Sequence, residues 1–166
     1  PAPRSRSAAR ICMSIMLAAL LPLAAPAAVQ AGTLEIEAAA ENGPEVVLDR
    51  ADLESLEQVR IETNTPWTER RRAFEGPALV DVLDAAGIAG EAVELVALND
   101  YRVTMPLDHA GPDYPIIAHR IDGKTFSVRE RGPFWVIFPY DRGREFRSEK
   151  FAGWSVWQLS EIRVIP

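Results

Sequence analysis

Short runs of alternating or β-branched residues, separated by turn residues, fill the second half of this chain. Val93–Leu98 is apolar and β-branched, Tyr101–Met105 alternates between apolar and polar residues, and Phe134–Phe138 is continuously apolar. Between two further runs of this kind, Asp122 and Gly123 form a strong hairpin signal. Runs this short are typical of strands, so the pattern predicts a domain that is built mostly of β-structure.

Two stretches have helical signals instead. Leu48–Leu56 predicts a short helix that begins at Asp49 or Asp52. Pro77 opens a second helix, whose apolar residues recur on one side until Gly87 ends it. The fold class expected is therefore α+β, mostly β with two or three short helices. We expect a polar loop over residues 141–150. The other expected strands are Thr33–Ala38, Val59–Thr63, Arg70–Phe74, Tyr114–His119, Trp154–Trp157 and Glu161–Ile165.

Residues 1–31 have the composition of a secretory signal peptide. Basic residues precede the apolar run Ile11–Leu23, and small residues then lead to Ala31. The alternative is a membrane anchor, but a spanning helix needs about 20 apolar residues, and Pro22 interrupts this run. We expect cleavage after Ala31, a periplasmic or secreted protein, and no membrane insertion after cleavage.

Without this leader, the chain has the length of one domain. We expect an N-terminal strand and helix over residues 32–56, followed by a domain over residues 57–166. The whole sequence has 18 basic and 24 acidic residues and a formal net charge of −6, and loss of the leader's three arginines makes it −9. Such a surface repels nucleic acid and anionic lipid, so we expect neither as a partner.

The sequence contains one cysteine, Cys12, and it lies in the leader. The rest of the chain therefore has no thiolate that could act as a nucleophile or metal ligand. There are two histidines, without the spacing of a zinc site. We find no nucleophile elbow, no paired catalytic carboxylates and no phosphate loop. We accordingly assign no catalytic residue and no metal ligand.

Several motifs follow one another in an order that is more specific than any one of them. They are, along the chain, Phe74–Leu83, Ala97–Val103, Ile116–Ala118 with Asp122–Lys124, Gly132–Pro139 and Trp154–Val164. Together, over about residues 57–165, they resemble the sulfite-oxidase-like molybdopterin-binding domain, especially small exported single-domain members of that family. The resemblance implies the sulfite-oxidase-like molybdopterin-binding fold and makes molybdopterin the cofactor to consider.

The sequence departs from this family where its enzymes bind metal. In those enzymes a cysteine thiolate on the segment before the Gly-x-x-Leu helix binds molybdenum. The corresponding segment here, Val59–Thr65, has no cysteine, and Thr63, Asn64 and Thr65 cannot replace a soft sulfur ligand. The family's enzymes also place several arginines around the pterin phosphate. Arg70–Arg72 cannot all converge on one group, because neighbouring residues of a strand point to opposite faces.

Asn99, Asp100 and Tyr101 are the first candidate ligand-binding residues. By resemblance, they would line the pocket in which family members hold the pterin, with the amide and carboxylate facing ring nitrogens. The alternative is a tight turn in which Asn99 and Asp100 satisfy local backbone groups. We favour the turn, because Asx turns are common.

A basic segment provides the second group of candidates. Arg142, Arg144, Arg147 and Lys150 concentrate positive charge in one polar loop, and Arg142, Arg147 and Lys150 are the candidate ligand-binding residues among them. One interpretation is a site for a small anion such as phosphate or sulfate. The other, which we favour, is a solvated loop whose cations pair with nearby carboxylates, because runs of surface charge contribute little.

One loop provides the two remaining candidate ligand-binding residues. Asn64 and Trp67 lie in the loop near the missing cysteine, and an exposed Trp67 would indicate a binding surface. We expect the other tryptophans to be core residues. Alternation along Phe134–Phe138 places Trp135 and Ile137 on one face of the strand and its other residues on the opposite face.

Three functions are compatible with these observations. The preferred one is an exported, non-catalytic binding module that holds a small ligand or a partner protein, such as an envelope sensor or membrane protein. The alternative is a molybdopterin-dependent oxidoreductase whose metal is bound without cysteine. The third is a structural envelope protein without a ligand.

Overall fold

The computed structural model describes residues 32–40 and 42–166. The predicted signal peptide, its cleavage site after Ala31 and Cys12 lie outside the described residues. Within them, no helix is both long enough and apolar enough to cross a membrane.

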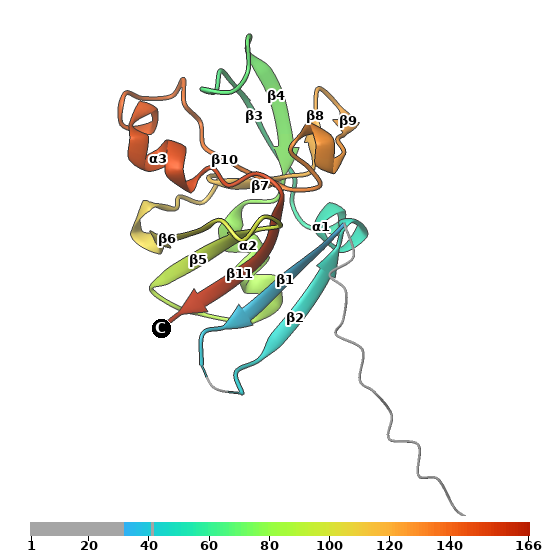
Figure 1. The fold of residues 1–166 in the computed structure, drawn as a ribbon, viewed down its shortest axis with the longest axis vertical. Coiled ribbons are helices and arrows are strands. Elements are labelled where there is room, and N and C mark those ends of the chain that lie inside the picture. The colour runs from blue at the N-terminus through green and yellow to red at the C-terminus, as the bar shows by residue number, and fades with distance from the viewer. Residues whose placement is uncertain (1–31, 41) are drawn as a thin grey trace, which may run out of the picture.

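A five-stranded sheet forms the main layer of the fold (Figure 1). The parallel pair of β1 and β11 lies in its middle, and the other neighbouring strands are antiparallel. The chain therefore brings its first and last described strands side by side. In sheet order the strands are β2 (Glu45–Asp49), β1 (Thr33–Ala38), β11 (Leu159–Ile165), β5 (Ala92–Ala97) and β6 (Arg102–Pro106).

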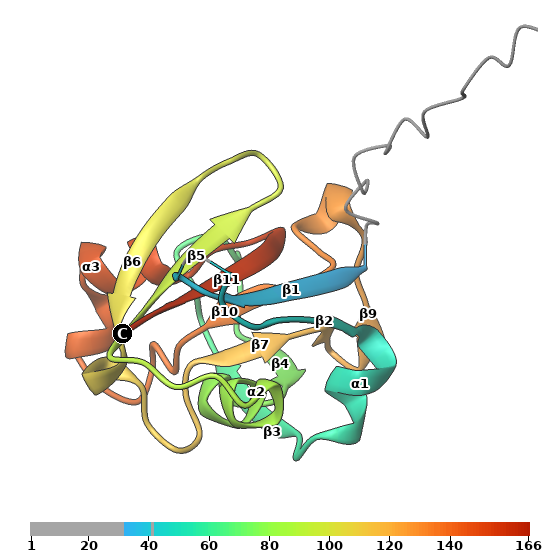
Figure 2. The same cartoon turned by 90° about the horizontal axis from the view of Figure 1, so that it is seen from below.

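Helix α2 (Leu79–Ala86) covers one face of this sheet (Figure 2). Its apolar stripe, which includes Leu79 and Val82, belongs to the same buried cluster as Leu34 and Ile36 of β1. The helix ends at Gly87, whose φ of 69° is the left-handed conformation that glycine adopts readily. The predicted position and end of this helix are confirmed.

A second region of smaller sheets lies beyond the main sheet. Strands β7 (Ile116–Ala118) and β10 (Trp135–Ile137) pair with each other, next to a four-stranded sheet. Alternation along β10 connects two cores: Trp135 and Ile137 lie in one buried cluster, whereas Val136 lies in the other. This confirms the predicted faces of the strand. The four-stranded sheet has the order β3 (Val59–Thr63), β4 (Arg72–Gly76), β8 (Arg120–Ile121) and β9 (Lys124–Thr125).

Local signals set two further features correctly. Helix α1 (Arg50–Ser55) begins after Asp49, whose side chain accepts a hydrogen bond from the backbone of Asp52 in a reciprocal capping box. Strands β8 and β9 are joined through Asp122 and Gly123, which have the positive φ values of a tight hairpin turn.

The structure differs from the prediction near the C-terminus. Residues 141–150 are not only loop, because they contain a 3-10 turn (Glu145–Arg147) and the start of helix α3 (Glu149–Trp154). Trp154 therefore ends a helix and does not begin a strand. Phe151 and Trp154 are three residues apart and both buried, so tertiary packing stabilises this helix. The polar residues around them gave the sequence the pattern of a loop. Two other 3-10 turns are Leu107–His109 and Val128–Glu130.

Most strands begin and end within two residues of their predicted bounds, but one is shifted as a whole by two residues and another was not predicted. The predicted strand Arg70–Phe74 is shifted to Arg72–Gly76, and strand β2 was not predicted. The residues of β2 alternate between exposed and half-buried, so this edge strand has little apolar signal of its own. It forms by pairing with β1.

Candidate functional site

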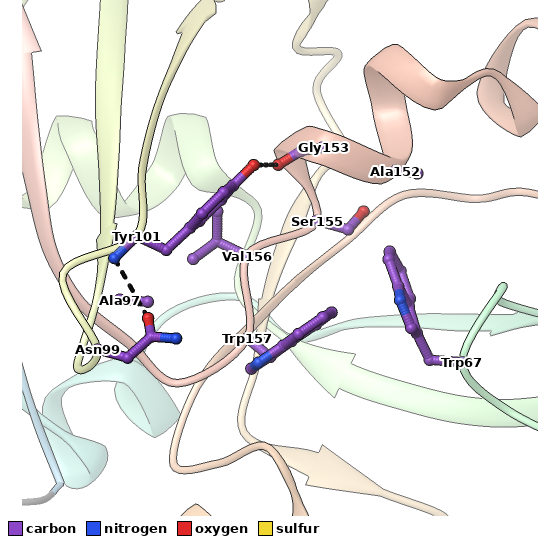
Figure 3. A pocket seen from close by; sticks show the side chains of 9 residues that line it. All are labelled: Trp67, Ala97, Asn99, Tyr101, Ala152, Gly153, Ser155, Val156 and Trp157. Carbon is purple, nitrogen blue, oxygen red and sulfur yellow. Dashed lines mark hydrogen bonds between the residues drawn. The ribbon is translucent and has the colours of Figure 1, made fainter.

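Three segments that are distant in the sequence surround a cavity of about 340 Å³ (Figure 3). Trp67 comes from the loop between β3 and β4. Asn99 and Tyr101 come from the turn between β5 and β6. Residues 152, 153 and 155–157 come from the end of α3 and the segment after it. We call this the aromatic cavity.

Its most prominent walls are two indole rings. The ring centroids of Trp67 and Trp157 lie 5.3 Å apart with an interplanar angle of 77°. Trp67 also contacts Trp135 and Tyr140 in tilted and edge-on arrangements, so it is held by aromatic neighbours on several sides. Ala97 and Val156 add apolar surface. The cavity therefore fits a largely apolar group better than a charged one.

Some polar groups of Asn99 and Tyr101 already form hydrogen bonds with other described residues, and one does not. The Tyr101 hydroxyl donates to the Gly153 carbonyl at 3.2 Å, and Asn99 Oδ1 accepts from the Tyr101 backbone at 3.2 Å. The Asn99 side-chain NH₂ makes no hydrogen bond in the described part of the chain. It is therefore a donor that a ligand in the cavity could use.

Ser155 lines the cavity, and its one hydroxyl hydrogen is already used in a hydrogen bond. Its hydroxyl lies 2.6 Å from the Tyr140 hydroxyl and donates to the Phe151 carbonyl at 3.0 Å. Burial raises the pKa of Tyr140 to about 12, although the hydrogen bond to Ser155 opposes this rise. Both hydroxyls thus stay protonated near neutral pH and serve to join α3 to the core. Neither is placed as an activated nucleophile.

Asn99 forms an Asx turn through Oδ1, as the favoured interpretation predicted, but within the described residues the Asp100 side chain makes no hydrogen bond to a local backbone group. Asp100 has a φ of 64°, and its backbone N–H donates to Ala97 O at 3.0 Å. Asp100 does not line the aromatic cavity, whereas its two neighbours Asn99 and Tyr101 do. The two interpretations are thus compatible: a local turn presents two side chains to a cavity.

Around the position of the missing cysteine, at the end of β3 and in the loop after it, the polar groups of Thr63 and Asn64 are engaged in hydrogen bonds. Thr63 is 1% exposed, its hydroxyl donates to Asn64 O at 3.1 Å, and it accepts from Asp141 N at 3.0 Å. The backbone and side-chain N–H groups of Asn64 both donate to Asp141 Oδ2 at 2.8 Å. This donor set leaves Asp141 with a lowered pKa, primarily because of the Asn64 backbone bond.

These residues do not fit a molybdenum centre. The side chains at the position where the resemblance would place a thiolate are engaged in structural hydrogen bonds and offer hard oxygen and amide groups. Among the described residues, no group of three or more His, Cys, Asp or Glu side chains is arranged to hold a metal ion. Asn64 borders a separate shallow hollow with Arg147, and it does not reach the aromatic cavity.

The basic segment does not converge on one point. Arg142 forms a bidentate pair with Asp113, at 3.1 and 2.7 Å. Arg147 donates to Tyr140 O at 3.0 Å and lies 3.3 Å from an oxygen of Asp141. The hydrogen bond from Arg142 lowers the pKa of Asp113. These contacts agree with the favoured interpretation, in which the cations pair with carboxylates.

Lys150 is separated from both arginines. Its Nζ lies 2.7 Å from Nε2 of His109 and 4.8 Å from the ring centroid of Trp154. None of Arg142, Arg147 and Lys150 lines the aromatic cavity.

Sequence analysis missed the contribution of α3 and the segment after it. Ala152, Gly153, Val156 and Trp157 line the cavity, but the region was expected to be a loop and a strand, with its tryptophans in the core. The available signal was the spacing of Phe151 and Trp154, which suits one face of a helix.

No known protein family matches this chain, and no curated protein does. Among solved structures, the chain is similar to the crystal structure of the sulfane dehydrogenase SoxCD from Paracoccus pantotrophus, with a TM-score of 0.57 and 14% sequence identity. The match covers 86% of this chain and 40% of that one, so this chain spans less than half of its neighbour's length. At this identity the likeness shows the fold alone. The chain has a mixed α+β fold like that of a sulfite-oxidase-family protein, which confirms the expected fold class.

Proposed function

We propose that this chain is a small exported relative of the sulfite-oxidase-like molybdopterin-binding domain that acts in the periplasm as a non-catalytic binding module. Its aromatic cavity would hold a small, flat, uncharged aromatic ligand. One observation carries the proposal: two tryptophan rings and an unpaired Asn99 amide face a cavity of about 340 Å³. Cavities of this kind, apolar with a few polar groups, are typical of small-molecule sites.

The chemistry of the neighbouring side chains supports a role in binding. The hydroxyls of Ser155 and Tyr140 form a hydrogen bond with each other, and Thr63 and Asn64 both form hydrogen bonds with Asp141. An activated nucleophile needs an adjacent base, and a redox metal needs donors that point into an open site. The residues around the aromatic cavity provide neither arrangement.

Filling the cavity tests the proposal. Ala152 is half-buried on α3 and lines the cavity, so Ala152→Leu adds bulk there without removing a hydrogen bond. The probe is 6-hydroxymethylpterin. Its binding is measured by isothermal titration calorimetry and by the quenching of tryptophan fluorescence. We expect saturable binding to the unchanged protein. In the variant the affinity should fall at least about tenfold, which corresponds to a loss of about 1.4 kcal/mol of binding free energy.

The matched control is Ala85→Leu, the same exchange at an exposed position of α2 that is remote from the cavity. It should bind the probe as the unchanged protein does. Equal affinity in all three proteins, or no binding and no quenching with the unchanged protein, would argue against a pterin-like ligand in this cavity.

Metal analysis separates this proposal from the alternative of a molybdopterin-dependent oxidoreductase. The protein is purified from its native host, and its molybdenum content is measured by mass spectrometry. A background level is expected. Stoichiometric molybdenum, held by oxygen or nitrogen donors, would overturn the non-catalytic proposal.

A protein partner is a second candidate, favoured by the rim of the same cavity. Leu98 and Tyr101 are large apolar side chains that are 38% and 47% exposed beside it. An envelope sensor or membrane protein could bury both.

A further inference from the structure

A second and larger hollow, of about 740 Å³, shares Trp67 with the aromatic cavity but is lined by charge. Five basic side chains border it, together with three acidic ones. We call it the basic groove. Its cations come from separate segments of the chain: Arg70 in the loop before β4 and Arg72 at the start of β4, Lys124 on β9, and Arg129 and Arg131 in and after the 3-10 turn Val128–Glu130.

Three of the five cations, which are exposed, make no direct side-chain hydrogen bond or ion pair among the described residues, although Arg70 still interacts electrostatically with Asp122. Arg72 is paired with Asp122 at 2.6 Å, but Arg70, Lys124 and Arg129 are exposed and make no side-chain hydrogen bond or ion pair within the described residues. The chain as a whole has a formal net charge of −6, so an unpaired basic cluster is unusual on its surface. Clustered positive charge of this kind attracts anions.

Two of the groove's carboxylates already have structural roles. Both oxygens of Asp122 are occupied, one by Arg72 and the other by the Ala73 backbone N–H at 2.9 Å. Glu130 Oε2 accepts from the backbone and the hydroxyl of Ser127, which closes a capping box. These bonds lower the pKa of both carboxyls, mainly through the backbone N–H in each case. Asp122 and Glu130 therefore stabilise the walls of the groove, and neither forms an ion pair with Lys124 or Arg129.

Arg131 is fixed in an uncommon conformation. Its φ is 77°, and its guanidinium lies 5.6 and 5.7 Å from the ring centroids of Trp135 and Trp157. Its carbonyl also accepts from the Gln158 backbone at 2.9 Å. A non-glycine residue in the left-handed region costs about 1 kcal/mol, and such strained positions cluster at ligand clamps. The aromatic contacts orient the guanidinium without a carboxylate partner.

We propose that the basic groove binds a small organic polyanion with two or three carboxylate or phosphoryl groups. Guanidinium groups bind both kinds of oxyanion in bidentate fashion, and cations on three segments suit charges that are spaced apart. The hollow has the volume of a site for an organic molecule and exceeds that of a single inorganic ion. Trp67, Phe126 and Trp135 supply apolar surface for the ligand's body. The groove is a different hollow from the aromatic cavity, although the two share Trp67 as a common wall.

Calorimetric titration of the purified protein at low ionic strength tests the groove. The probes are benzene-1,3,5-tricarboxylate and pyrophosphate, which separate carboxylate from phosphoryl recognition, with benzoate as the single-charge comparison. We expect saturable binding of at least one polyanion, weaker binding of benzoate, and affinity that falls as salt is added. The double variant Arg70→Gln, Arg129→Gln should bind that polyanion at least about tenfold more weakly.

Arg144→Gln provides the matched control, since Arg144 is an exposed arginine outside the groove. It should bind as the unchanged protein does, and so should Ala152→Leu, which alters only the aromatic cavity. Circular dichroism confirms that each variant is folded. The proposal is overturned if neither polyanion binds, if benzoate binds as tightly, or if Arg144→Gln weakens binding as much as the double variant.

Discussion

The imidazole of His119 is 1% exposed, and one of its nitrogens has no hydrogen-bond partner among the described residues. Gln58 Nε2 donates to the carbonyls of Leu53 and Leu56, which turns Gln58 Oε1 toward Nε2 of His119 at 2.8 Å. Nε2 is therefore the donor, and Nδ1 of the neutral ring is left unpaired, 3.8 Å from Glu54. Burial lowers the pKa of His119, and the charge of Glu54 only partly opposes this.

The lowered pKa of His119 predicts a loss of stability in weak acid. Because the folded pKa lies below the unfolded value of about 6.5, the unfolded chain binds the proton more readily as the pH falls. The contribution of neutral His119 to the free energy of unfolding is fully present above the unfolded pKa. It is lost as the pH falls below that pKa, by up to about 1.4 kcal/mol between pH 7.5 and 5.5. Urea unfolding at both pH values measures this loss. His119→Gln should reduce it, and an unchanged loss in the variant would contradict the assignment.

At the scale of elements, two glycines at the ends of β4 and α2 have different reasons to be there. A Cβ at Gly76 would collide with the backbone of Ile117, because β4 and β7 approach closely. A Cβ at Gly87 would meet nothing within 4 Å, but its φ of 69° is unfavourable for other residues. The first glycine answers a packing constraint and the second a conformational one.

These reasons predict unequal costs for the same exchange. Gly87→Ala should lower the free energy of unfolding by about 1 kcal/mol, the cost of the left-handed conformation alone. Gly76→Ala should cost more than about 3 kcal/mol or prevent folding, because two strand backbones must separate. Urea denaturation of the two variants compares them. Similar costs would show that the close approach at Gly76 is absent in solution.

Elements with strong local signals were predictable, and those without were not. The capping box at Asp49, the hairpin at Asp122 and the helix stop at Gly87 depend on residues within one turn of each other. Strand β2 and helix α3 lack such signals: β2 forms by pairing with β1, and α3 by burying Phe151 and its neighbours. Tertiary contacts outweigh weak local preference there.

For the whole molecule, the N-terminal segment is part of the central sheet. Strand β1 pairs with β2 on one side and with β11 on the other, and its Leu34 and Ile36 are fully buried. Leu53 of α1 is equally buried in the same core. Residues 32–56 therefore contribute to the core that residues 57–166 also build.

A fragment of residues 57–166 should consequently fail to fold. It loses three fully buried aliphatic side chains, each worth about 1.5–3 kcal/mol, and exposes the edge of β11. Total stabilities of single domains are only about 5–15 kcal/mol. Thermal unfolding followed by circular dichroism compares the fragment with residues 32–166. A cooperative transition at a similar temperature in both would show that residues 57–166 are an independent domain.

The sequence by itself determined the fold class, most strand and helix positions, the faces of Phe134–Phe138 and the lack of any cysteine after Cys12, because these depend on residue type and short-range periodicity. Only the tertiary structure decided which candidates meet. It brought Trp67, Asn99 and Tyr101 to one cavity, left Arg142, Arg147 and Lys150 apart, and gathered an unforeseen basic groove. The physical reason is that these hollows are formed by segments that are distant along the chain, and their packing has no local signature.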